Sequence, residues 1–299
     1  MITHNNMKKT PSNHTTKSRK KHRRLIVFLL AFTVLFASYV IYGNTTVTVT
    51  RYDIHSERIP PGFDGFCIVQ ISDLHNGSNS VMTDSLLKKT AEAHPDVILI
   101  TGDTIDRFDS DVDTAIKVVE KLIDFAPVYY VTGNHEARTG AYYKLAKLMR
   151  KIGVTELSDS FVNVRLNNDE IVIAGVNDPL TAHDTTASDK AIMEKRLSQL
   201  QYDPRFYTVL LSHRPELMDV YSSNNIDLVF TGHAHGGLIR LPLIGGLYAP
   251  HQGLMPKYTE GLYKQSFTSM IVSRGVGNSG RTFRINDNPE LVVAVLHAG

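Results

Sequence analysis

The sequence predicts an α/β fold in which two sheets form a sandwich flanked by helices, preceded by one N-terminal transmembrane helix. Short, continuously apolar runs of strand length alternate with amphipathic helical segments, a pattern typical of strands covered on both faces. An uncharged apolar stretch follows a basic tail near the start of the chain. Apolar residues make up 42% of the 299 residues and charged residues 21%, so the composition is that of a globular protein.

Charge divides the chain into a basic tail and a mildly acidic remainder. Residues 1–24 contain eight lysines and arginines and no acidic residue, whereas the whole chain has a net charge of +2. The remaining residues therefore carry 24 basic and 30 acidic side chains, a net charge of −6. We interpret residues 1–24 as a cytoplasmic tail. A nucleic-acid partner is not expected, because an apolar run follows the tail directly.

The eighteen residues from 25 to 42 contain no charge and predict a membrane anchor. As a helix they would be about 27 Å long, close to the roughly 30 Å hydrocarbon core of a bilayer. The basic flank would stay in the cytoplasm, which predicts a single-pass protein of the cell membrane with residues 43–299 outside the cytoplasm. A cleaved secretory signal has the same order of charge and apolar run, and a twin-arginine export signal at Arg23 and Arg24 is a further alternative.

Residues 43–299 are expected to form one domain. Its predicted strands are 45–54, 66–72, 96–101, 128–132, 207–212 and 227–231. Its predicted helices are 82–93, 112–124, 140–151, 188–200 and 214–222. Two pairs of runs are interpreted as hairpins, "FVNVRL" with "EIVIAGV" and, near the C-terminus, "MIVSR" with "LVVAVL". Residues 238–299 would then supply a loop at the functional site and the closing strands.

Polar side chains with the chemistry of metal ligands follow five of the apolar strands. The loops at the carboxyl ends of strands meet in open α/β sheets, so we expect these side chains to converge. In chain order they are Asp73, His75, Asp103, Asn134, His135, His213, His233 and His235.

Imidazole, carboxylate and amide groups are the ligands that first-row divalent ions such as Mn, Fe and Zn take in proteins. The single cysteine, Cys67, lies in an apolar run and is expected to be a small buried side chain. There are more candidate ligands than one ion needs, so the sequence predicts two divalent ions that share a carboxylate. Two ions about 3.5–4 Å apart would bind a phosphate and activate water. Glycines before Asp103, Asn134 and His233 would let the backbone turn sharply at these positions.

The ordered motifs Asp73-x-His75, Gly102-Asp103, Gly133-Asn134-His135-Glu136, His213 and Gly232-His233-x-His235 resemble those of the calcineurin-like metallophosphoesterases. The resemblance covers residues 64–237, and the segments 246–263 and 273–280 resemble the bacterial, membrane-associated branch of that family. It implies the family's αββα sandwich. It also implies one ion held by Asp73, His75, Asp103 and His235, and a second held by Asp103, Asn134, His213 and His233.

The same resemblance implies roles for residues outside the metal shell. His135 matches the histidine that faces the leaving group and gives it a proton, and Asp106 matches the acid that orients this histidine. Arg107 matches an arginine that binds phosphate, with Asn134 as a further substrate contact. The glycine that usually follows this arginine is replaced by Phe108.

Several other polar residues are interpreted as ordinary. Glu136 is expected to be a solvated acid in the first turn of a helix, with a neighbour of the metal ligands as the alternative. His251 is expected to be an ordinary histidine, in a loop rich in proline and glycine that could fold over the site. The segment "GVGNSG" (275–280) is expected to be a tight turn between strands, with a phosphate-binding nest as the alternative. The tyrosines fit a substrate pocket and a hairpin face equally well; they are Tyr248, Tyr258 and Tyr263.

Together these features predict a membrane-anchored, two-metal phosphoesterase that hydrolyses phosphate mono- or diesters. The substrate would be a phosphorylated small molecule or a lipid, with envelope lipids, lipid-linked pyrophosphates and extracellular nucleotides all open. The alternative is an envelope protein that binds metal or phosphate without catalysis. A proton-donating histidine outside the metal shell favours the enzyme over the binding protein. The Asn134 ligand disfavours a metal-dependent amidase or peptidase.

Overall fold

The computed structural model describes residues 13–299 except 78, 185 and 281, and it divides after Tyr42 into two compact units. The first unit is formed by helix α1 (Asn13–Thr45), whose last three residues belong to the second unit. Within the described residues, α1 is the one helix that is long and apolar enough to cross a membrane, by length and composition, over Lys20–Thr45. The helix extends beyond the apolar run at both ends. Lysine and arginine are good helix formers, which explains its continuation into the basic tail.

The second unit, residues 43–299, is called the body here, and its first sheet has six strands. Their order is β1 (Thr48–Ser56), β16 (Glu290–Ala298), β2 (Cys67–Ile71), β3 (Val97–Thr101), β4 (Val128–Val131) and β5 (Thr155–Glu156). All neighbours are parallel except β16 and β2, which are antiparallel. Parallel β2, β3 and β4 therefore end at the same edge of the sheet.

The second sheet also has six strands. Their order is β14 (Gly261–Gln265), β15 (Thr268–Val272), β9 (Leu228–Thr231), β8 (Tyr207–Leu211), β7 (Asp169–Gly175) and β6 (Ser160–Leu166). The four inner strands are parallel, and the outer strands β14 and β6 are antiparallel to their neighbours. Strands β8 and β9 thus point their carboxyl ends in one direction.

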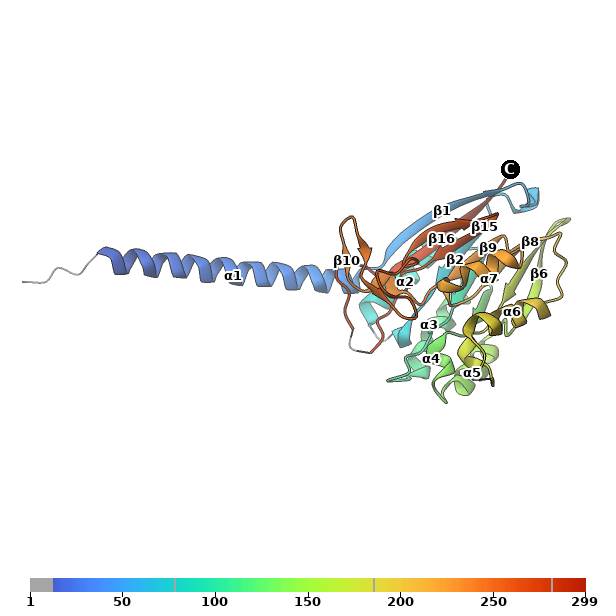
Figure 1. Ribbon diagram of the computed structural model, residues 1–299, viewed down its shortest axis with the longest axis horizontal. Helices are drawn as coiled ribbons and strands as arrows, with labels where there is room; N and C mark the ends of the chain where they lie inside the picture. The colour runs from blue at the N-terminus through green and yellow to red at the C-terminus, as the bar shows by residue number, and fades with distance from the viewer. Residues whose placement is uncertain (1–12, 78, 185, 281) are drawn as a thin grey trace, which may run out of the picture. The chain divides into compact units, whose positions relative to one another are not determined.

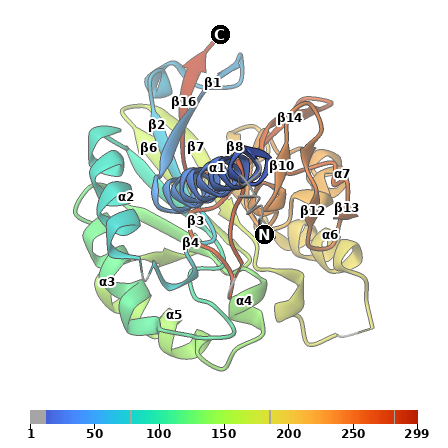
Figure 2. The ribbon, with the colours of Figure 1, turned by 90° about the vertical axis from the view of Figure 1, so that its left-hand side faces the viewer.

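The two sheets pack face to face between two layers of helices. The core between the sheets takes Ile68 and Leu99 from the first sheet and Ile173, Leu211 and Phe230 from the second, all fully buried. Helices α2 (Ser80–Glu92), α3 (Val112–Leu122) and α5 (Tyr142–Ile152) cover the outer face of the first sheet. Helices α6 (Asp189–Gln199) and α7 (Met218–Ser223) cover the outer face of the second (Figures 1 and 2). The predicted two-sheet α/β sandwich is confirmed.

Local capping explains why the helices begin where they do. The side chain of Asn79 accepts a hydrogen bond from Met82 N at the start of α2, and Asp111 accepts one from Thr114 N at the start of α3. Ser188 caps α6 in the same way through Ala191 N. Gly153 ends α5 in the left-handed conformation, with φ at 97°.

The expected C-terminal hairpin is wrong. Strand β15, which contains "MIV", pairs with β14 and β9 in the second sheet, whereas "LVVAVL" lies in β16 of the first sheet. The physical reason is that β16 is buried on both faces over most of its length, which suits a central strand of a sheet that is covered on both sides. The hairpin of β6 and β7 is confirmed. Sequence reasoning did not find the small hairpins β10 (Arg240–Leu241) with β11 (Gly245–Gly246) and β12 (Tyr248–Ala249) with β13 (Gly253–Leu254).

The last strand is expected to be essential for stability. Leu291 in β16 is fully buried against the helices of the first sheet, so Leu291→Ala should reduce the free energy of unfolding by about 2–5 kcal/mol. The matched control, Leu262→Ala on the outer strand β14, where the leucine is 36% exposed, should cost less than about 1 kcal/mol. Urea unfolding of the full chain in detergent, followed by circular dichroism, measures both. Equal losses would contradict the central position of β16.

Candidate metal centre

The candidate ligands named from the sequence lie together at the carboxyl ends of β2, β3, β4, β8 and β9. All seven are buried, with exposed fractions between 0% and 6%. Two of the three-residue clusters with metal-ligand geometry contain six of these seven: Asp73, His75 and His235 in one, and Asp103, His213 and His233 in the other. The carboxyl ends of strands from both sheets therefore bring these polar side chains together at one site.

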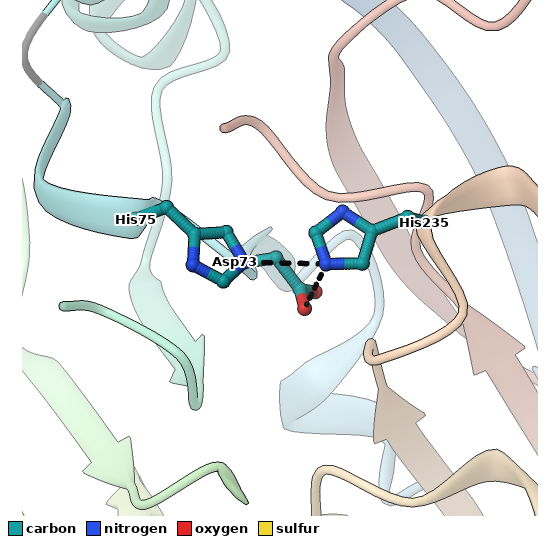
Figure 3. Close-up of side chains that lie close together, drawn as sticks. All are labelled: Asp73, His75 and His235. Atoms are coloured by element: carbon teal, nitrogen blue, oxygen red, sulfur yellow. Dashed lines mark hydrogen bonds and ion pairs between the residues drawn. The ribbon is translucent and has the colours of Figure 1, made fainter. Parts of the chain in front are cut away.

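The first cluster joins the loop after β2 to the turn η5 (His235–Gly237) after β9 (Figure 3). His75 Nε2 lies 3.2 Å from His235 Nε2, and His235 Nε2 lies 3.3 Å from Asp73 Oδ1. The remaining nitrogen, His75 Nδ1, is buried without a hydrogen-bond partner among the described residues and is 3.5 Å from Asp106 Oδ2. Two imidazole nitrogens and a carboxylate oxygen thus lie within 3.3 Å of their neighbours, a donor set that suits a metal ion.

The second cluster shows the same convergence, and here the tautomer of one histidine is fixed. His213 Nδ1 lies 2.7 Å from the carbonyl oxygen of Thr101, which can only accept, so Nδ1 carries the proton. The lone pair of Nε2 in neutral His213 then faces Asp103 Oδ2 and Asn134 Oδ1, each 3.3 Å away. In its neutral form, His213 therefore places a nitrogen lone pair beside two oxygen acceptors.

A cation satisfies this arrangement. Burial lowers the pKa of His75 to about 4 and holds the pKa values of His233 and His235 well below the usual value, so these rings are neutral with a free lone pair at pH 7. Burial also opposes protonation of His213, but the charge and hydrogen bond of Asp103 raise its pKa to about 10. Asp103 therefore favours the protonated, positively charged form of His213. Buried nitrogen and oxygen donors of this kind fit divalent ions.

The backbone around the clusters is strained and tightly packed. A Cβ atom at Gly232 would overlap the side chains of Ser72 and Asp73, and one at Gly133 would overlap Asp103, so only glycine allows these close approaches. Five of the seven candidate ligands have φ between 45° and 67°, the left-handed region: Asp73, His75, Asp103, His233 and His235. Such conformations persist where the surrounding fold imposes them, and they gather at functional sites.

His135 lies beside the two clusters and is oriented by a backbone group. Its Nδ1 accepts a hydrogen bond from the backbone N–H of Arg107 at 3.0 Å, so Nε2 carries the proton of the neutral ring. Asp106 Oδ1 is farther from Nδ1, at 3.8 Å. The Asp106 carboxylate instead accepts from Phe108 N and Gly280 N. Nε2 of His135 is 3.8 Å from Asp103 Oδ2.

The interpretation of Glu136 as a solvated acid is wrong. Glu136 is 1% exposed, and its carboxylate accepts hydrogen bonds from the backbone N–H groups of Asp103, Gly133 and Ile105 at 2.9, 2.8 and 3.0 Å. Burial and the charge of Asp103 raise its pKa to about 7. Glu136 is the third residue of helix α4 (Asn134–Ala137), where an acid commonly accepts from the N-cap N–H. The third position of a helix was the sequence signal that Glu136 could accept hydrogen bonds from backbone N–H groups.

A cavity of about 220 Å³ opens above the clusters and contains residues that sequence reasoning left aside. Arg138 and His251 line it together with Arg107, Tyr248 and Leu238. The interpretation of His251 as ordinary is wrong, because its Nδ1 lies 2.9 Å from His233 Nε2. It was missed because it follows the Gly-His-x-His motif at a distance, in a loop without regular periodicity.

The segment 275–280 is more than a turn between strands. Its backbone N–H groups at Val276 and Gly277 donate to Ser72 O and Asp73 O, and Gly280 N donates to Asp106. The segment therefore encloses the candidate metal centre on the side of β2. Tyr258 and Tyr263 pack edge to face with ring centroids 4.9 Å apart, whereas Tyr248 lines the cavity, so the tyrosines divide between the two expected roles.

Glu136 provides a test of how the centre is held. Glu136→Gln should destabilise the body by about 1–3 kcal/mol, because the amide NH₂ would face a backbone N–H instead of accepting from it. It should also weaken metal binding, since the N–H of Asp103 loses its fixed partner. Glu120→Gln on the exposed face of α3 is the control and should change neither. Denaturant unfolding and metal titration of the full chain measure the two effects, and an unchanged Glu136→Gln would refute this role.

Comparison with known proteins identifies the family. A family model described as calcineurin-like phosphoesterase matches residues 67–237. An uncharacterized metallophosphoesterase of Bacillus subtilis, YkuE, is 32% identical over 257 residues, which cover 84% of this chain and 85% of the relative. A transmembrane protein with metallophosphoesterase domain from Bos taurus is 28% identical over 94% of this chain and 64% of its own length.

A solved structure adds support for the fold alone. TT1561 of Thermus thermophilus has a TM-score of 0.50 with 12% identity, over 71% of this chain and 90% of that structure. The family match spans more than half of the chain and includes every strand end that carries a candidate ligand. Relatives occur in both bacteria and eukaryotes. The chain therefore belongs to the calcineurin-like phosphoesterase family, which places it among the metal-dependent hydrolases of phosphoric esters.

Proposed function

We propose that the body is a two-metal phosphoesterase in which Asp103 is shared by both ions. Asp73, His75, Asp103 and His235 would hold one ion, and Asp103, Asn134, His213 and His233 the other. The observation that carries this proposal is the hydrogen bond from His213 Nδ1 to the carbonyl oxygen of Thr101. It leaves Nε2 as the nitrogen that would bind an ion, 3.3 Å from both Asp103 Oδ2 and Asn134 Oδ1. When bound, two divalent ions such as Mn, Fe or Zn supply Lewis-acid activation of water and neutralise charge on the phosphoryl group.

The remaining steps belong to side chains of the cavity wall. His135 in its protonated form would donate the proton on Nε2 to the departing oxygen, and the neutral ring that remains would keep its proton on Nδ1, which is 3.8 Å from Asp106 Oδ1. Asp106 lies near both His75 and His135 and would support their orientation, as the resemblance implies. Arg107 would bind the phosphate with Asn134, and Arg138 adds a second guanidinium to the cavity.

The substrate we infer is a phosphate mono- or diester of a small molecule or of a lipid. Two arginines favour an anion larger than one phosphoryl group, and Leu238 and Tyr248 give the same cavity an apolar wall. An apolar N-terminal helix and a relative described as transmembrane support a place at the membrane. We propose that α1 anchors the protein as a single pass and that the charge of its flank places the body outside the cytoplasm.

The proton donor can be tested through the leaving group. His135→Ala should lower the hydrolysis rate by about 10²–10⁴-fold for esters of alkyl alcohols, and much less for p-nitrophenyl esters, whose leaving group needs little protonation. His183→Ala, an exposed histidine outside the cavity, should keep the parent rates. Steady-state kinetics of the full chain in detergent with both ester types give the comparison. An equal loss on both would show that His135 does not act as an acid.

The shared carboxylate can be tested by metal content. The full chain should bind two divalent ions, and Asp103→Asn should lose at least one of them, since the neutral amide cannot balance two cations. Asp84→Asn, at an exposed position of α2, should retain both. Elemental analysis after dialysis against manganese or zinc measures the stoichiometry, and turnover of p-nitrophenyl phosphate measures the consequence. Retention of two ions by Asp103→Asn would overturn the bridging assignment.

A further inference from the structure

The segment 238–258, called the 238–258 lobe here, exposes large apolar side chains. It consists of the two small hairpins β10–β11 and β12–β13, which are joined by backbone hydrogen bonds from Leu247 N to Ile239 O and from Met255 N to Leu247 O. Leu243 is fully exposed, and the others are exposed by 40% to 79%: Leu241, Ile244, Tyr248, Leu254 and Met255. Exposed large apolar side chains gathered within one short segment are a feature of interaction sites.

The charge of the lobe is opposite to that of the chain around it. Residues 238–258 contain Arg240, His251 and Lys257 but no acidic residue, whereas the chain after residue 24 has a net charge of −6. Arg240 pairs with Glu260 just beyond the lobe, while Lys257 is exposed. Exposed apolar side chains with basic and aromatic neighbours suit a surface of anionic lipid headgroups over acyl chains.

The first residues of the body are held next to the base of this lobe. Asn44, the second residue of the body, donates to Arg284 O at 2.9 Å and accepts from Arg284 N at 2.8 Å. The following residue, Ile285, forms a parallel bridge with Ile239 and exchanges hydrogen bonds with Leu238 and Arg240. Tyr42, the last residue of the apolar run, precedes Asn44 by two positions. A bilayer that holds this run therefore lies within two residues of chain from Asn44.

We propose that the 238–258 lobe docks on the membrane, with Leu243, Ile244, Leu254 and Met255 in the interfacial region of an anionic phospholipid bilayer. Tyr248 fits the headgroup level, where aromatic side chains with a polar end collect. The same lobe supplies Leu238, Tyr248, Pro250 and His251 to the wall of the cavity. If the proposed phosphoesterase function holds, docking would therefore bring the entrance of the site to the level of lipid headgroups.

The chain contains no tryptophan, which allows a direct test. The full chain carrying Leu243→Trp is reconstituted into vesicles of zwitterionic and anionic phospholipids, with and without brominated acyl chains. Docking predicts a blue-shifted emission and loss of most of the fluorescence in brominated vesicles. Leu243 is fully exposed, so the substitution should leave the fold intact, which circular dichroism checks.

The control is Tyr143→Trp on α5, where the tyrosine is 80% exposed. Helix α5 lies away from β10 in both views (Figures 1 and 2). Its emission should stay red-shifted and unquenched. Equal quenching of the two variants, or none in Leu243→Trp, would overturn the proposal. A blue shift of Leu243→Trp without quenching would also overturn it, because a second protein copy would then cover the lobe. The readout does not depend on turnover, so failure here leaves the phosphoesterase proposal standing.

Discussion

Asp103 belongs to the second ligand cluster, with its buried carboxylate facing His213 and His135. A buried negative charge among lone pairs is costly unless positive charge is supplied, and this electrostatic constraint organises the whole edge of the sandwich. Glu136 holds the amide of Asp103, and the N–H of His135 donates to Asp103 Oδ1 at 2.7 Å. The loops after β3 and β4 are thus fixed to each other before any ion or substrate contributes.

The sandwich makes this convergence possible because its two sheets bring parallel strands to one edge. Strands β2, β3 and β4 come from the first sheet and β8 and β9 from the second, and the apolar core between them is fully buried. A rigid core of this kind can impose left-handed backbone on non-glycine ligands, which a flexible loop could not sustain. The packed core between the sheets therefore offsets the energetic cost of the left-handed backbone at the ligands.

The buried strands and their polar ends could be predicted from the sequence because both signals are local. Apolar runs such as "DVILIT" have strand length, and the residues that follow them share one chemistry. Contacts made across long sequence separations could not be predicted in this way. His251 contacts His233 from a separate hairpin. Strand β16 lies between β1 and β2, and its composition does not indicate which strands it pairs with. The burial of Glu136 was not predicted, because an acid in the first turn of a helix gives the same sequence signal whether it is buried or exposed.

The position of β16 has a consequence for how the protein is made. Among the described strands, β1 pairs with β16 alone, and β16 follows all the other strands in the sequence. During synthesis β1 therefore has no partner in the sheet, and the edge of β2 is open, until β16 has left the ribosome. The first sheet is thus completed late, and an unpaired edge is exposed meanwhile to chaperones or to neighbouring nascent chains.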